Sequence, residues 1–133
     1  MNLGRLLAAG TLSICAAGPA SAAPAAARGE QIYVRCQACH ALSYDRVGPR
    51  HCGLFGRTAG SVPGFAYSPA MKSSHIVWND KTLDRFLANP LKMVPGTTMT
   101  YDGVPDAADR ADLLAYLEGA DKAPECITLK AKH

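Results

Sequence analysis

Two cysteines and a histidine form the motif Cys36-Gln37-Ala38-Cys39-His40. Two thiols three positions apart at the end of a helix can add across the two vinyl groups of one haem, and the adjacent histidine can then bind the iron. A Cys-x-x-Cys pair also occurs in thioredoxin-like redox sites and in half of a zinc site. The first needs a βαβ setting and the second needs another closely spaced ligand pair, and the sequence offers neither. The motif therefore predicts covalent attachment of a haem.

The iron of a haem held by one histidine either has a second axial ligand or is five-coordinate. The side chains that could supply it are Met71, Met93, Met99, His51, His75 and His133. Met99 is the preferred candidate, because Pro95-Gly96-Thr97-Thr98 places it on a constrained loop. A thioether favours ferrous iron and raises the reduction potential, which suits an electron carrier. A single loop methionine is more often a packing residue, so the spacing alone leaves the other candidates open.

The N-terminal segment has the pattern of a secretory signal peptide. Arg5 precedes an apolar and small-residue stretch over 6–17, and Ala20-Ser21-Ala22 supplies the small residues of a cleavage site. We expect residues 1–22 to be removed, which would leave 23–133 as the mature chain in an oxidising compartment. An uncleaved membrane anchor is disfavoured, because roughly a dozen apolar residues fall short of the ~20 that span a bilayer.

Composition limits the class of protein. The chain has 133 residues, a formal net charge of +3 and 48% hydrophobic residues, which predicts one folded domain and gives no reason to expect a nucleic-acid partner. Residues 28–57 hold five arginines against two acidic residues, whereas 102–125 hold seven acidic residues against two basic ones. The folded chain could present one basic and one acidic face, or these could be ordinary solvated charges.

Helical periodicity predicts three helices, which begin near residues 26, 80 and 107. The first carries its apolar stripe up to Cys36. Asn79 or Asp80 can cap the second, which Pro90 stops. Asp106 can cap the third, and Gly119 is expected to end it.

Two segments, 41–70 and 90–105, are rich in glycine and proline and are predicted as long loops. Such long loops in a small domain suggest that something other than polypeptide packs against them. Because no stretch alternates like a strand for more than a few residues, the expected fold class is all-α.

Taken together, the motifs resemble class I cytochrome c, a family of small haem proteins of mitochondria and bacteria. The resemblance runs from Gly29 to Leu117. Beyond the cysteine motif it rests on Val47-Gly48-Pro49, Gly53-Leu54-Phe55-Gly56-Arg57-x-x-Gly60, Pro63-Gly64-Phe65-x-Tyr67-Ser68, Trp78, Asn89-Pro90, Pro95-Gly96-Thr97-x-Met99 and the helix 110–117. It implies a single domain around one covalently bound haem c, with a short C-terminal extension after about residue 120.

The resemblance also implies roles for individual side chains. His40 and Met99 would be the iron ligands, and the Pro49 carbonyl would bind the other ring nitrogen of His40. Three residues, Arg57, Tyr67 and Trp78, would bind a buried haem propionate, which needs such donors. Gly29 and Tyr33 would meet Tyr116 where the first and last helices cross. Without the resemblance, each of these side chains is more readily explained as a structural residue.

The sequence departs from the family pattern at several positions. Cys52 replaces a histidine common before Gly-Leu-Phe-Gly, Met71 replaces an asparagine of the haem pocket, and Phe86 lacks a tyrosine hydroxyl. Thr98 and Leu91 stand where lysines are common. These departures imply a less polar haem crevice and a less basic surface around it, and the lost donors should change the reduction potential.

Cys52 and Cys126 remain after haem attachment and signal removal. An even number of spare cysteines in an exported protein suggests a disulfide. The alternative is a buried Cys52 that acts as a small hydrophobic residue and a Cys126 in a mobile tail.

The sequence therefore predicts a soluble electron-transfer protein of the periplasm, rather than an enzyme, that cycles haem iron between Fe(III) and Fe(II) in a respiratory or photosynthetic chain. Expected partners are a membrane cytochrome reductase and an oxidase or photosynthetic reaction centre, met in transient encounters as a monomer without stable membrane insertion. Two alternatives remain open: a dedicated electron-accepting subunit of a periplasmic dehydrogenase or oxidase, and a haem enzyme or gas sensor with a displaceable methionine.

Overall fold

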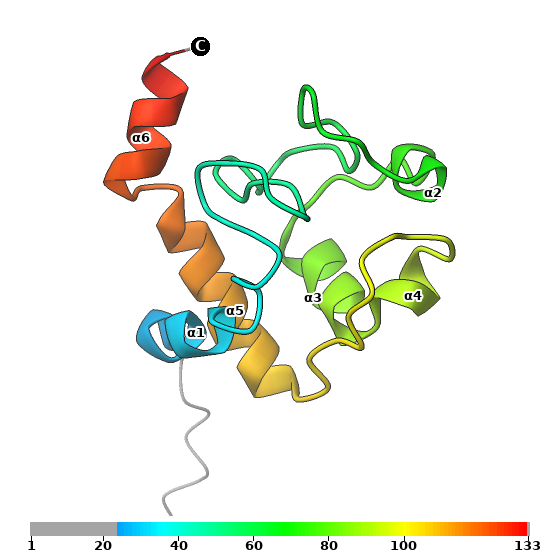
Figure 1. The fold of residues 1–133 in the computed structure, drawn as a ribbon. Coiled ribbons are helices and arrows are strands. Elements are labelled where there is room, and N and C mark those ends of the chain that lie inside the picture. Colours follow the sequence, from blue (N-terminus) through cyan, green and yellow to red (C-terminus); the bar gives the residue numbers. More distant parts are fainter. Residues whose placement is uncertain (1–23, 133) are drawn as a thin grey trace, which may run out of the picture.

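The computed structural model describes residues 24–132, which fold into helices without a β-strand (Figure 1). These helices are α1 (Ala26–Tyr33), α2 (Pro69–Lys72), α3 (Asp80–Ala88), α4 (Pro90–Met93), α5 (Ala107–Ala120) and α6 (Pro124–Ala131). The expected all-α single domain is confirmed. None of the described helices has the length and apolar character needed to cross a membrane. The predicted signal peptide and His133 lie outside the described residues.

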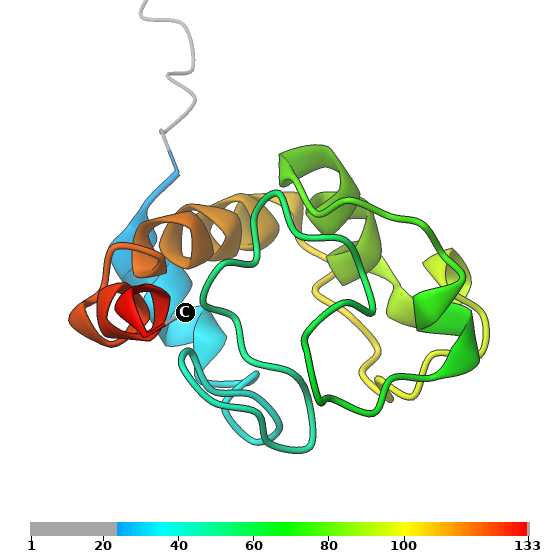
Figure 2. The ribbon, with the colours of Figure 1, turned by 90° about the horizontal axis from the view of Figure 1, so that it is seen from above.

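Helices α1 and α5, which are far apart in the sequence, cross in close contact (Figures 1 and 2). A Cβ at Gly29 would lie 2.0 Å from the Asp112 carbonyl oxygen, so the two backbones can approach only because this residue is glycine. The buried Asp112 carboxylate accepts a hydrogen bond from the Ala25 backbone N–H at 2.7 Å. The rings of Tyr33 and Tyr116 lie 5.1 Å apart across this crossing, which confirms the expected packing of the first and last helices of the predicted set.

The cysteine motif lies just beyond α1 rather than within it. The predicted stripe extended to Cys36, but α1 ends at Tyr33 and the chain continues in tighter turns. The Cys36 N–H donates to the Tyr33 carbonyl at 2.8 Å, and the His40 N–H donates to the Cys36 carbonyl at 2.9 Å. The motif is therefore held by consecutive backbone turns, which place its side chains beside the loops that follow.

Helix α3 begins and ends as its local sequence predicts. The Asn79 side chain accepts a hydrogen bond from the Thr82 N–H, and the Thr82 hydroxyl accepts one from the Asn79 N–H, which completes a capping box. Pro90 cannot donate a backbone hydrogen bond, and α3 ends at Ala88. The Asn89 side chain then caps α4 by accepting from the Lys92 N–H at 2.9 Å.

The predicted end of the last helix and the predicted loop segments both need correction. Helix α5 is capped by Asp106 as expected, but it runs one residue beyond Gly119, because Gly119 does not adopt the left-handed conformation of a C-terminal glycine cap. The predicted loops are also not wholly irregular, since α2 lies at the end of the first and α4 at the start of the second. Each short helix begins with a proline, whose fixed φ suits the first helical position.

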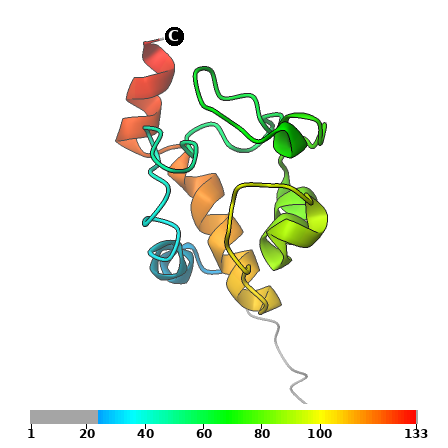
Figure 3. The ribbon, with the colours of Figure 1, turned by 45° about the vertical axis from the view of Figure 1, so that its right-hand side comes forward.

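The C-terminal extension is helical and anchored. Helix α6 projects beyond the end of α5 (Figures 1 and 3), and a disulfide joins its fully buried Cys126 to Cys52. The Asp121 carboxylate between the two helices accepts a hydrogen bond from the Gly53 N–H at 2.6 Å. The disulfide hypothesis is therefore confirmed in this structure, and the alternative of Cys126 in a mobile tail is wrong.

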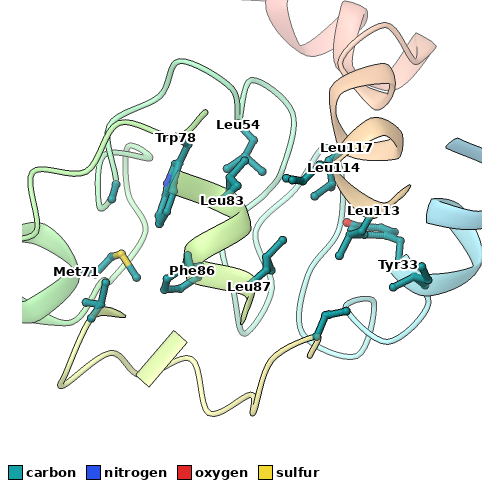
Figure 4. Close-up of a cluster of buried hydrophobic side chains, with 14 residues drawn as sticks. Tyr33, Leu54, Met71, Trp78, Leu83, Phe86, Leu87, Leu113, Leu114 and Leu117 are labelled. Atoms are coloured by element: carbon teal, nitrogen blue, oxygen red, sulfur yellow. The ribbon is translucent and has the colours of Figure 1, made fainter. Parts of the chain in front are cut away.

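The core gathers on the inner sides of α1, α3 and α5 and on the loops that face them (Figure 4). Leu113 at its centre is wholly buried. The rings of Trp78 and Phe86 pack together within this cluster, with centroids 5.0 Å apart. Much of this core faces a cavity rather than further side chains, and that cavity is the candidate site.

Candidate haem site

A cavity of about 330 Å³ lies between the loops 35–71 and 97–101 and the helices α3 and α5. Its wall on the helix side is apolar and includes Leu83, Phe86, Leu87, Leu113 and Leu117. All of the predicted site residues also line it, namely Cys36, Cys39, His40, Pro49, Arg57, Tyr67, Trp78 and Met99. The long loops are thus the walls of a cavity, as their length suggested.

The two motif cysteines are free thiols at this cavity. Cys36 is half-buried and Cys39 is exposed. Burial raises the pKa of the Cys36 thiol to about 11, and the neighbouring Arg35 opposes this shift only in part. Cys36 is therefore protonated near neutral pH, whereas the open position of Cys39 leaves it accessible.

His40 is buried and its ring orientation is fixed by a backbone carbonyl. Its Nδ1 lies 2.7 Å from the Pro49 carbonyl oxygen. Because a carbonyl can only accept, Nδ1 carries the proton and the lone pair is on Nε2. Burial lowers the pKa of His40, partly offset by the Pro49 hydrogen bond. The ring is thus neutral, with a ligating nitrogen that no described protein group occupies.

Met99 lies on the loop that the Pro95-Gly96 turn begins. Gly96 has a φ of +91°, which favours glycine, and the Met99 N–H donates to the Thr97 hydroxyl at 3.2 Å. The thioether is half-buried and lines the cavity.

The other candidates for the second iron ligand differ in whether they line the cavity. Met71 and His51 also line the cavity, but Met93 and His75 do not. Met93 packs against the core, as expected of a packing residue, and His75 is exposed.

Arg57 places a guanidinium on the cavity wall. It donates to the Cys52 carbonyl at 3.2 Å and to the Arg50 carbonyl at 2.9 Å, and no ion pair involves it among residues 24–132. Burial lowers its pKa, but an arginine stays protonated in proteins. Tyr67 lies beside it, and its hydroxyl accepts a hydrogen bond from the Val62 N–H at 3.3 Å.

The donor set fits a haem. Two thiols, a neutral imidazole and a thioether surround one apolar cavity, and a cation without a carboxylate partner in the described chain faces the same space. A half-buried cation of this kind is stabilised by an anion, and a haem propionate would supply one. Trp78 completes this part of the wall, where its backbone N–H donates to the Arg57 carbonyl at 3.0 Å.

The residues that depart from the family pattern lie in or near the cavity wall or on the surface. Met71 is buried in the cavity wall, and Phe86 contributes an aromatic ring with no hydroxyl. Thr98 lines the cavity and is exposed, and Leu91 lies exposed on α4. Apolar or neutral groups therefore lie at the positions where the resemblance noted polar or basic residues as common, as the less polar crevice inferred from the sequence requires.

Three contacts around His40 were not predicted from the sequence. A Cβ at Gly48 would lie 2.2 Å from the His40 ring, so this glycine allows the ring to pack against the backbone. His51 had been considered only as an iron ligand, but it stacks on His40 and shares a hydrogen bond with Tyr33. The contact of Gly48 with His40 could have been predicted from the position of Gly48 directly before Pro49. No local sequence pattern predicts the contact between Tyr33 and His51.

Comparisons with known proteins show the family and the fold of this chain. The cytochrome c family model matches residues 26–121. Cytochrome c2 of Blastochloris viridis is 38% identical over 86% of this chain and 92% of its own length, and cytochrome c of Euglena viridis is 44% identical over 70% and 94%. The solved structure of cytochrome cH from Methylobacterium extorquens superposes with a TM-score of 0.70 at 40% identity, over 71% of this chain and 98% of the other.

A family match across most of the chain, a cytochrome c fold and a cavity lined by the Cys-x-x-Cys-His motif lead to one conclusion. This protein is a member of the cytochrome c family, an electron-transfer protein with a single covalently attached haem c.

Proposed function

We propose that this protein is a soluble one-electron carrier in which Cys36 and Cys39 bind the haem through thioethers and His40 and Met99 are its axial iron ligands. The observation that supports this most is the orientation of His40. The His40 Nδ1–H donates a hydrogen bond to the Pro49 carbonyl oxygen, with the two atoms 2.7 Å apart, which leaves the Nε2 lone pair for a metal. The two thiols and the Met99 thioether line the same cavity.

When bound, the haem supplies one centre that cycles between Fe(III) and Fe(II). The protein's part is to hold the ligands and to exclude water. The hydrogen bond from His40 to Pro49 raises the basicity of Nε2 and fixes its direction. The apolar side chains of α3 and α5 keep the cavity wall dry, which favours the less charged ferrous state.

Three polar residues would bind one haem propionate. Arg57, Tyr67 and Trp78 lie on the same wall of the cavity, and Arg57 forms no ion pair within the described chain. A buried carboxylate is stable only when it is paired and hydrogen-bonded, and this group offers both interactions.

The setting that we propose is the periplasm of a bacterium, in a respiratory or photosynthetic chain. The predicted signal peptide and the likeness to bacterial cytochrome c2 support it. The partners would be a membrane cytochrome reductase and an oxidase or photosynthetic reaction centre. Exposed Cys39 and Val47 lie at the cavity edge, which would allow close but transient approach of such partners by a monomer.

The axial ligand is tested by replacing Met99 with alanine in the haem-loaded protein. We expect the oxidised parent to show the weak near-infrared charge-transfer band that is typical of methionine-ligated ferric haem. The M99A variant should lose that band while the c-type spectrum of the reduced protein remains.

Two matched variants control for the general effect of losing a methionine. Met71→Ala removes another thioether of the cavity wall, and Met93→Ala removes one that does not line it. Both should keep the band. Loss of the band in M71A and its retention in M99A would exclude the proposed ligand.

Size-exclusion chromatography of the native protein tests whether it is a free carrier. A monomer that reduces and reoxidises with separate partners supports the carrier role. Co-elution with one dehydrogenase or oxidase would instead identify a dedicated subunit.

A further inference from the structure

A second imidazole lies against the proposed iron ligand. The rings of His40 and His51 stack with their centroids 4.3 Å apart and their planes 23° from parallel. One face of the His51 ring therefore covers a face of His40.

One hydrogen bond does not fix the plane of the His40 ring. The Pro49 carbonyl holds the position of Nδ1, but the ring could still rotate about the direction of that bond. Backbone at Gly48 restricts part of this rotation through its close approach to the ring. A flat ring in stacking contact restricts it further, because rotation of His40 would bring its edge into the His51 face.

His51 is itself oriented by an anchor on helix α1. Its Nδ1 lies 3.0 Å from the Tyr33 hydroxyl oxygen, and Tyr33 is only 1% exposed. The His51 backbone N–H donates to the carbonyls of Ala41 and Leu42, directly after the ligand, at 3.1 and 3.0 Å. Both the backbone and the side chain of His51 are thus held, which leaves its ring one orientation relative to His40.

A packing role alone does not require this pair of polar groups. An aliphatic side chain at position 51 and a phenylalanine at position 33 would fill the same space without two partly buried polar atoms. A neutral hydrogen bond of this kind contributes little net stability, about 0.5–1.5 kcal/mol. What it adds is a defined direction, since each polar atom must face its partner to avoid an unsatisfied group.

We propose that His51 is a positioning residue, whose ring, oriented by the Tyr33 hydroxyl, sets the rotation angle of the His40 imidazole. This inference rests on the proposed role of His40 as an axial ligand. The plane of an axial imidazole sets the directions of the iron d-orbital axes in the ferric state. His51 therefore controls how unpaired spin is distributed around the haem rather than whether the haem binds.

The test uses the oxidised haem-loaded protein and two complementary variants. Tyr33→Phe removes only the hydroxyl and keeps the ring at position 33. His51→Asn keeps a polar atom near the position of Nδ1 but removes the stacked ring. We expect both variants to shift the pattern of paramagnetically shifted haem methyl proton resonances, with the larger shift in H51N.

A double variant and a matched control variant complete the design. Y33F combined with H51N should give the H51N pattern without a further shift, because the hydroxyl acts only through the His51 ring. Tyr116→Phe is the matched control, since Tyr116 packs on Tyr33 but is not hydrogen-bonded to His51. Its haem methyl pattern should equal that of the parent.

The outcomes separate this inference from the proposed function. If the parent protein is low-spin and shows the near-infrared methionine band, the proposed ligands are supported. Unchanged haem methyl patterns in Y33F and H51N would then overturn only the positioning role of His51. A lower unfolding midpoint without a changed pattern would likewise reduce His51 to a structural residue. If H51N fails to load haem, Y33F decides the question by itself, because the loss of one hydroxyl leaves the packing intact.

Discussion

At the scale of single residues, the orientation of His40 depends on backbone as much as on side chains. The Pro49 carbonyl holds Nδ1, and the missing side chain of Gly48 lets the imidazole lie against the chain. A two-residue segment that carries no polar side chain thus fixes the position of Nδ1 and limits how the His40 ring can lie.

Replacement of Gly48 by alanine tests this arrangement. The new Cβ would lie 2.2 Å from His40 Cε1, so the ring or the loop must move. We expect the free energy of unfolding to fall by about 1–3 kcal/mol, as for other overpacked sites, and the near-infrared methionine band to weaken. Guanidinium unfolding and the optical spectrum of the oxidised protein measure the two effects.

Pro49→Ala is the matched control for that variant. It changes the side chain next to Gly48 but retains the carbonyl that binds His40. Its band should remain close to that of the parent. Equal stability and equal spectra for G48A and the parent would contradict the steric argument.

The residues of the site differ in how far the sequence could predict them. Cys36, Cys39 and His40 form one local motif, whose spacing alone indicates haem attachment. Met99 and Arg57 needed the family resemblance, because a lone methionine or arginine has no distinctive local pattern. The contact between Tyr33 and His51 was not predicted, since it joins residues 18 positions apart whose proximity depends on how the chain folds back.

At the scale of secondary-structure elements, helix α6 lies outside the part of the chain that the family model covers. That match ends at residue 121, whereas α6 spans Pro124–Ala131. Helices α3 and α5 were predictable because their caps are local, but the helical state of the extension was not predicted. Its anchor is the disulfide between Cys52 and Cys126, whose partners lie 74 residues apart in the sequence.

Loss of this disulfide should lower stability without changing the haem ligands. In the double variant C52S/C126S we expect the free energy of unfolding to fall by about 2–4 kcal/mol, chiefly because the unfolded chain gains freedom. Guanidinium unfolding of the oxidised haem-loaded protein measures this loss. An unchanged midpoint, or a lost near-infrared band, would contradict a purely stabilising role.

At the scale of the whole molecule, the core is built around its cavity. The large side chains of Trp78, Leu83, Phe86 and Leu113 line a space of about 330 Å³ as well as packing in the core cluster. The cavity is open at one edge, so without its occupant these apolar side chains would contact water. Burying a large apolar side chain contributes about 1.5–3 kcal/mol, so the loss of a few is comparable with the roughly 5–15 kcal/mol that stabilises an ordinary domain.

The chain without haem should therefore not keep this fold. In the variant C36A/C39A, which cannot form thioethers, we expect most of the helical circular dichroism and the cooperative thermal transition to be lost. C52S/C126S, which lacks two cysteines but keeps the motif, is the control and should retain both. A cooperative transition in haem-free C36A/C39A would show that polypeptide contacts alone suffice.

The separation of the thiols into two pairs has a consequence for biosynthesis. Cys36 and Cys39 must stay reduced until they react with the vinyl groups of the haem. Cys52 and Cys126 are instead oxidised to a disulfide. Cys36 and Cys39 come much earlier in the chain than Cys126. In a polypeptide exported from its N-terminus, Cys36, Cys39 and Cys52 would thus emerge before Cys126, and Cys52 would lack its native disulfide partner while the haem-binding thiols are still free.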